Sequence, residues 1–124
     1  MTWKPIETAP ISAMLERVEA ASGPVSDGEW RTLYRAAIGS PDSITFQHFL
    51  AAIEGSLDHA IAFTEAAVPG AKKLIREESK QWVTTHWRAV LEHQNSPYTS
   101  VGDAPTPALA LVIATLRALR DGAA

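Results

Sequence analysis

A run of mainly apolar residues near the C-terminus, from Thr106 to Leu119, carries its first charge only at Arg117. Thr106 is suited to cap a helix at its N-terminus, and Pro107 fits the first helical position, where no amide donor is needed. Apolar side chains recur at helical spacing and extend beyond one face, at Leu109, Leu111, Val112, Ile113, Leu116 and Leu119. The pattern predicts a helix that is buried on most of its sides and needs a cover on two of them.

Helical spacing also predicts two helices near the N-terminus. Residues 1–10 contain two prolines and little periodicity, so we expect an extended arm there. Apolar positions then predict a first helix over residues 11–21, which ends at Ser22-Gly23-Pro24. A capping box over residues 26–29 starts a second helix, which ends before Gly39-Ser40-Pro41.

The next segment predicts two more helices or one kinked helix. Asp42 or Ser43 is suited to cap a third helix, whose apolar stripe is interrupted at Gly55. Ser56 offers a new cap, and the helical spacing then continues to Pro69-Gly70. Gly55 either separates two helices or kinks one.

Residues 71–93 fit both a helical and a strand pattern. The β-branched run Val83-Thr84-Thr85 and the polar turn region 77–80 favour a β-hairpin. A period of two also links Val83, Thr85, Trp87, Ala89 and Leu91, which is typical of one face of a strand. We therefore predict a hairpin here, followed by a surface loop over residues 94–105.

Composition limits the chain to one domain and excludes several kinds of site. A length of 124 residues, with 46% hydrophobic and 20% charged side chains, fits one globular domain, which we place over residues 11–124. The lack of cysteine excludes disulfides and thiolate metal sites. The N-terminus lacks the apolar core of a signal peptide, and no apolar run approaches the roughly 20 residues of a membrane span. We expect a cytoplasmic protein.

Several phrases, taken in order, resemble small uncharacterised proteins of bacteriophages and prophages, a family described as a phage α-β-α sandwich domain of unknown function. They are residues 16–24, Ser56-Leu57-Asp58, Val68-Pro69-Gly70, a tryptophan-containing segment and residues 106–111. The resemblance covers residues 11–119 and implies a hairpin between the last two helices. The family brings no established catalytic or binding residues. The resemblance also places the C-terminal helix against this hairpin, so the sheet should be one cover of the helix. The apolar width of the helix requires a second cover, which is either the first two helices or a second copy of the chain.

The fold prediction is therefore a mostly helical α+β domain, with N-terminal helices and an α-β-β-α unit whose helices pack on a short antiparallel hairpin. Catalytic candidates are weak within it. Four histidines, His48, His59, His86 and His93, match no spacing typical of metal ligands, even with Glu54 or Asp58 beside them. No serine lies in a nucleophile elbow, and no glycine-rich phosphate loop occurs. We predict no catalysis, no cofactor and no metal.

The hairpin holds the strongest candidates for binding, because it gathers cations and aromatic residues. These are Lys72, Lys73, Arg76, Trp82, His86 and Arg88. Strand alternation puts Trp87 and Arg88 on opposite faces, and we expect Trp87 inside and Trp82 on the face of Arg88. The local positive charge suits a phosphate-bearing ligand or an acidic protein surface, although Glu77 and Glu78 dilute it.

Together with these patterns, the resemblance implies a non-enzymatic phage or prophage accessory protein of the host cytoplasm. We expect it to bind a host protein and to inhibit an antiviral defence protein. A net charge of -3 without concentrated positive charge argues against nucleic acid as partner. One alternative is a protein that sequesters a small nucleotide signal. The other is a structural or assembly protein that acts through self-association, as a homodimer.

Overall fold

A computed structural model of the chain describes residues 8–20, 27–39, 43–78, 86–92 and 99–121. In these ranges the chain forms five helices and three strands, which confirms a mostly helical α+β fold. In chain order they are α1 (Thr8–Ala20), α2 (Asp27–Ala37), α3 (Ile44–Ile53), α4 (Leu57–Ala67), β1 (Lys72–Glu77), β2 (Trp87–Glu92), β3 (Thr99–Ala104) and α5 (Pro107–Arg120).

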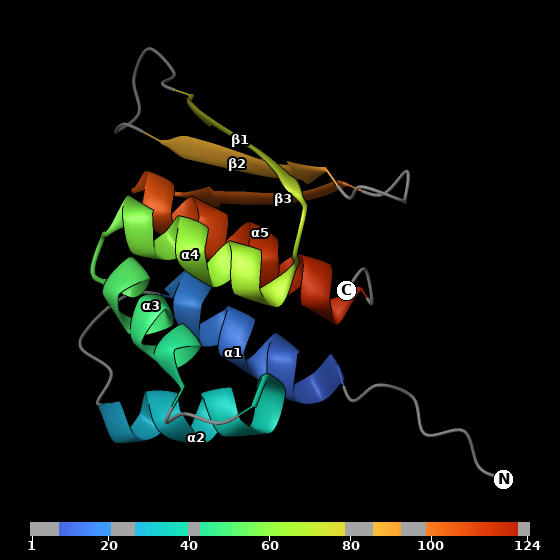
Figure 1. The fold of residues 1–124 in the computed structure, drawn as a ribbon. Helices are drawn as coiled ribbons and strands as arrows, with labels where there is room; N and C mark the ends of the chain where they lie inside the picture. Colours follow the sequence, from blue (N-terminus) through green and yellow to red (C-terminus); the bar gives the residue numbers. More distant parts are fainter. Residues whose placement is uncertain (1–7, 21–26, 40–42, 79–85, 93–98, 122–124) are drawn as a thin grey trace, which may run out of the picture.

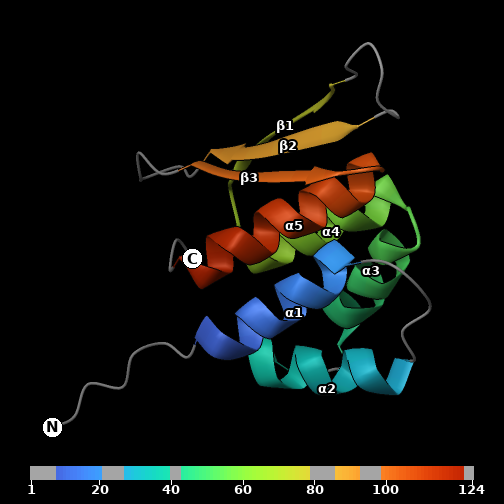
Figure 2. The same ribbon diagram turned by 180° about the vertical axis from the view of Figure 1, so that it is seen from behind.

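The elements lie in layers, with the sheet at one side of the molecule (Figure 1). Helices α4 and α5 lie beneath the sheet, α1 and α3 follow, and α2 is outermost, as the view from behind also shows (Figure 2). Helix α5 packs against all three strands on one side and against α1, α3 and α4 on the other. Both covers of this apolar helix therefore come from its own chain. The alternative of a second copy over α5 was wrong, and α2 packs on α1 instead of completing the cover.

The three strands form one antiparallel sheet in the order β1-β2-β3. The predicted hairpin is confirmed as β1 and β2, with Leu74 opposite Val90. The predicted surface loop over residues 94–105 was wrong over its second half, because β3 pairs with β2 there and puts Val101 opposite Val90.

Gly102 explains why this strand escaped prediction. A Cβ atom at this position would lie 2.6 Å from the backbone nitrogen of Ala114 and closer still to the carbonyl oxygen of Ala110. Glycine in the middle of a strand often marks such a close backbone approach, although in a sequence it is typical of a turn. The strand thus contains glycine because α5 lies directly against it.

The predicted helix caps are confirmed wherever the structure describes them. Ser43, Ser56 and Thr106 each accept a hydrogen bond from a backbone amide three residues later, at 3.3, 3.4 and 3.2 Å. Gly55, with φ of 113°, separates α3 from α4, so these are two helices. The proposed capping box at residues 26–29 begins outside the described residues. Helix α1 starts at Thr8, three residues before the predicted start.

Candidate binding face of the sheet

The sheet has one face covered by helices and one that they leave open. Figures 1 and 2 place α4 and α5 beneath the sheet, and none of the described helices lies over its other side. We call this other side the outer face. Strand alternation and the pairing register assign to it Lys72, Leu74, Arg76, Arg88, Val90, Glu92, Thr99, Val101 and Asp103.

An apolar row crosses the middle of the outer face. The register puts Leu74, Val90 and Val101 side by side on the three strands. Leu74 is 52% exposed, which makes it one of the few large apolar side chains at the described surface. Charged residues flank the row on both sides, Arg76, Arg88 and Asp103 on one side and Lys72 and Glu92 on the other.

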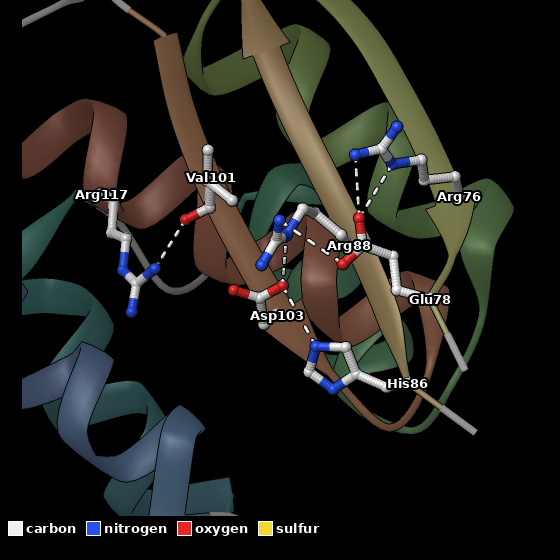
Figure 3. A network of polar contacts seen from close by, with 7 residues as sticks. All are labelled: Arg76, Glu78, His86, Arg88, Val101, Asp103 and Arg117. Carbon is white, nitrogen blue, oxygen red and sulfur yellow. Dashed lines mark hydrogen bonds and ion pairs between the residues drawn. The ribbon is translucent and has the colours of Figure 1, made fainter. Parts of the chain in front are cut away.

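A network of ion pairs fixes the side chains along one side of this row (Figure 3). Arg88 donates from Nε to Oδ1 of Asp103 at 2.8 Å, and Nε2 of His86 lies 3.2 Å from the same oxygen. Glu78 accepts from Nε of Arg76 at 3.0 Å and lies 3.4 Å from Nη1 of Arg88. The two arginines are therefore held in place by carboxylates.

The protonation of the network follows from these contacts. Partial burial alone would raise the pKa of Asp103, but the hydrogen bonds from Arg88 and His86 and the charges of these groups outweigh it, so the pKa is lowered. The hydrogen bond to Asp103, with the charges of Asp103 and Glu78, raises the pKa of Arg88. Asp103 is thus ionised at neutral pH, and its pair with Arg88 is a full ion pair.

The structure brings most of the predicted binding residues together. Lys72, Arg76 and Arg88 lie on the outer face. His86 contacts Asp103 of the same face. Lys73 points to the other side of β1, where it is largely buried, forms an ion pair with Glu65 of α4 and donates to the Ala71 carbonyl at 3.2 Å.

Lys73 is thus separated from the other predicted binding residues. Trp82 lies outside the described residues. Trp87 packs inward against the core while Arg88 faces the other way, which confirms their predicted orientations.

Sequence reasoning missed two kinds of residue on this face. The apolar row was not identified, because Val101 belongs to the unpredicted strand and its alignment with Leu74 appears only in the sheet. Asp103 was missed for the same reason. Glu78 was noted only as diluting the positive charge, whereas it contacts both arginines. Two of the predicted cations, Arg76 and Arg88, are therefore paired with carboxylates in the fold.

The histidines do not form a metal site within the described part of the chain, where no group of three potential ligands is found. The rings of His48 and His59 lie 5.3 Å apart between α3 and α4, and His59 Nδ1 contacts Ser56 Oγ at 2.6 Å. His86 is engaged with Asp103 on the sheet, and His93 lies outside the described residues. None of the described helices has the length and apolar character that crossing a membrane requires.

Comparisons of the chain with models of protein families, with curated proteins and with solved structures find no match. The resemblance to phage proteins stays a prediction from the sequence.

Proposed function

We propose that the protein acts by binding another protein through the outer face of its sheet, without catalysis. The apolar row of Leu74, Val90 and Val101 supports this proposal most directly. Protein interfaces combine an apolar centre with a polar rim, and arginine is enriched among the residues that dominate binding energy. The row and the two arginines beside it have this composition.

The charges of the outer face favour a protein over a phosphate-bearing ligand. Three lysine and arginine side chains lie beside the row. Arg76 and Arg88 are paired with Glu78 and Asp103, and Lys72 stands opposite Glu92 on β2. A phosphate group would have to compete with carboxylates already in contact with these guanidinium groups. A protein partner with an apolar patch of its own gains from the row without breaking the ion pairs, and it can reach the outward edges of the same arginines.

The cellular setting of the proposal rests on the resemblance to phage proteins. In that setting the partner is a host protein, and the consequence we propose is inhibition of a host antiviral defence protein. Occupation of a protein surface is enough for such an effect, so no catalytic group is needed.

The experiment compares substitutions on and off the outer face. Tagged wild-type protein, Leu74→Lys and Val101→Lys are used to capture partners from a bacterial host lysate, and the captured protein is quantified. Lysine is tolerated on edge strands, and β1 and β3 are the edges of the sheet. We expect both substitutions to reduce capture at least tenfold.

Ile44→Lys provides the matched control, because Ile44 is 73% exposed on α3, which lies in another layer than the sheet. It should leave capture unchanged. Equal capture by all four proteins would contradict the proposal.

A thermal-shift screen against nucleotides tests the alternative of a nucleotide-sequestering protein, since a bound ligand raises apparent stability. We expect no shift, and a saturable shift would favour that alternative instead.

A further inference from the structure

The two edges of the sheet differ in how their outward backbone groups are used. At β3, the carbonyl oxygen of Val101 accepts a hydrogen bond at 2.7 Å from Nη1 of Arg117 (Figure 3). Nη2 of the same arginine donates to Glu19 of α1 at 2.9 Å. A side chain held by two helices therefore occupies the β3 edge and protects it from pairing with another strand.

The β1 edge lies at the opposite side of the sheet, and no described strand pairs with it there. The amide of Glu78 donates to the carbonyl of His86 at 2.6 Å, which identifies the hydrogen-bonded positions between β1 and β2. By alternation, residues 72, 74 and 76 bond to β2. The backbone groups of Lys73 and Ile75 consequently point away from β2, toward the edge of the sheet.

The charges along this edge are complementary between two copies of β1 that run antiparallel. The strand begins with Lys72-Lys73, and Glu77-Glu78 stand at its other end. An antiparallel second β1 strand can form hydrogen bonds only where residues whose backbone groups point to the edge stand opposite each other in both copies. Only every second register meets this condition. The register centred on Ile75 puts Lys72 opposite Glu78 and Lys73 opposite Glu77, twice each. These pairs would add to the contacts that Lys73 makes with Glu65 and that Glu78 makes with Arg76 and Arg88.

The two neighbouring allowed registers put like charges opposite each other. A shift in one direction puts Lys72 opposite Arg76, and a shift in the other puts Arg76 opposite itself. Parallel pairing in register would align lysine with lysine and glutamate with glutamate. Like charges directly opposite each other destabilise a strand pair, whereas opposite charges stabilise it.

We propose that β1 pairs antiparallel with β1 of a second copy of this chain, around a two-fold axis at Ile75. The two three-stranded sheets then form one continuous sheet. Because this register puts Ile75 opposite Ile75, the helices of both copies lie on the same side, and the two outer faces join into one surface. The inference goes beyond the proposed function and holds whether or not the outer face binds another protein.

Disulfide cross-linking tests the register directly, because the chain contains no cysteine. Leu74 and Arg76 both lie on the outer face, and in the proposed register each stands opposite the other, with Cα atoms about 4.5 Å apart. This distance suits a disulfide, whereas two copies of residue 74 would be diagonal neighbours about 7–8 Å apart. The variants Leu74→Cys and Arg76→Cys are oxidised alone and as an equimolar mixture, with Thr99→Cys on β3 as control.

We expect the mixture to form a covalent dimer and each variant alone to cross-link no faster than the control. Rapid cross-linking of Leu74→Cys alone or of Arg76→Cys alone would indicate a shifted register and overturn the pairing at Ile75. Cross-linking of the mixture at the rate of the control would overturn the proposal as well.

Charge reversal provides an independent measurement on a variant expected to keep its fold. Lys72 is exposed at the start of β1, and Lys72→Glu puts like charges opposite each other at two symmetric places in the dimer. We expect the dimer dissociation constant, measured by sedimentation, to rise about tenfold. Arg35→Glu on α2 changes the net charge equally, at an exposed position of another layer, and should leave the constant unchanged. A monomeric wild-type protein, or an equal effect of both variants, would contradict the inference.

Discussion

The two faces of the sheet are built from alternate residues of the same strands, yet they follow different rules. The inner face packs Trp87 and Leu91 against the core, and it carries glycine at position 102 because α5 approaches β3 closely there. The outer face carries Leu74, Val90 and paired charges, and no described helix lies over it. Packing fixes the residues of the inner face, so substitutions there should affect folding. The outer face is free of this constraint, and its composition can serve binding.

The largest effect is expected from Gly102→Ala on the inner face. The added methyl group would lie 2.6 Å from the Ala114 nitrogen, and it would meet backbone, which cannot rotate away. The strand or α5 must shift, so we expect the free energy of unfolding to fall by about 3 kcal/mol, the upper part of the range for overpacked cores. Urea denaturation monitored by circular dichroism measures the change.

Gly39→Ala is the control for this substitution, because nothing lies within 4 Å of a Cβ atom there. Its effect should stay within about 0.5 kcal/mol, as for surface changes generally. Similar losses for the two variants would show that close packing of α5 is not the reason for glycine at position 102.

A smaller effect is expected at the polar contact on the helical side of α5. Thr64 of α4 and Thr115 of α5 are fully buried, and their hydroxyl oxygens lie 2.8 Å apart. Each hydroxyl also lies within hydrogen-bond distance of a carbonyl in its own helix, Ala60 at 2.9 Å and Leu111 at 2.8 Å. Thr115→Val keeps the shape and removes one hydrogen bond between the helices, which should cost about 1 kcal/mol.

A double-mutant cycle with Thr64→Val tests whether this contact is the cause. Replacing both hydroxyls leaves no polar atom unpaired between the helices, so the double variant should lose less stability than the sum of the two single variants. Additive losses would mean that each threonine matters only through its own helix.

The difference between the faces also explains how far sequence reasoning reaches. Caps such as Ser43 and Thr106 are local signals, and the orientation of Trp87 follows from strand alternation; the structure confirms all three. Strand β3 was missed because its glycine is explained by α5, which only the folded chain brings alongside. The site was half predicted for the same reason: Arg88 was identified, but Asp103, fifteen positions away, belongs to that strand.

The smallest effect is expected on the outer face, where Asp103→Asn removes the charge that Arg88 and His86 contact. The pKa of this carboxyl is lowered in the folded chain, so its contribution to stability is present above the ordinary value of 3.8 and is lost as the pH falls through the lower, folded value. At pH 7 we expect the variant to be less stable by about 1 kcal/mol or less, because the pair is partly exposed. The difference from wild type should shrink toward zero on acidification in urea denaturation. Glu92→Gln, on the same face and without an ion pair to any described residue, should show a smaller difference at pH 7. A difference for Asp103→Asn that grew on acidification would show that the ion pair does not stabilise this end of the outer face.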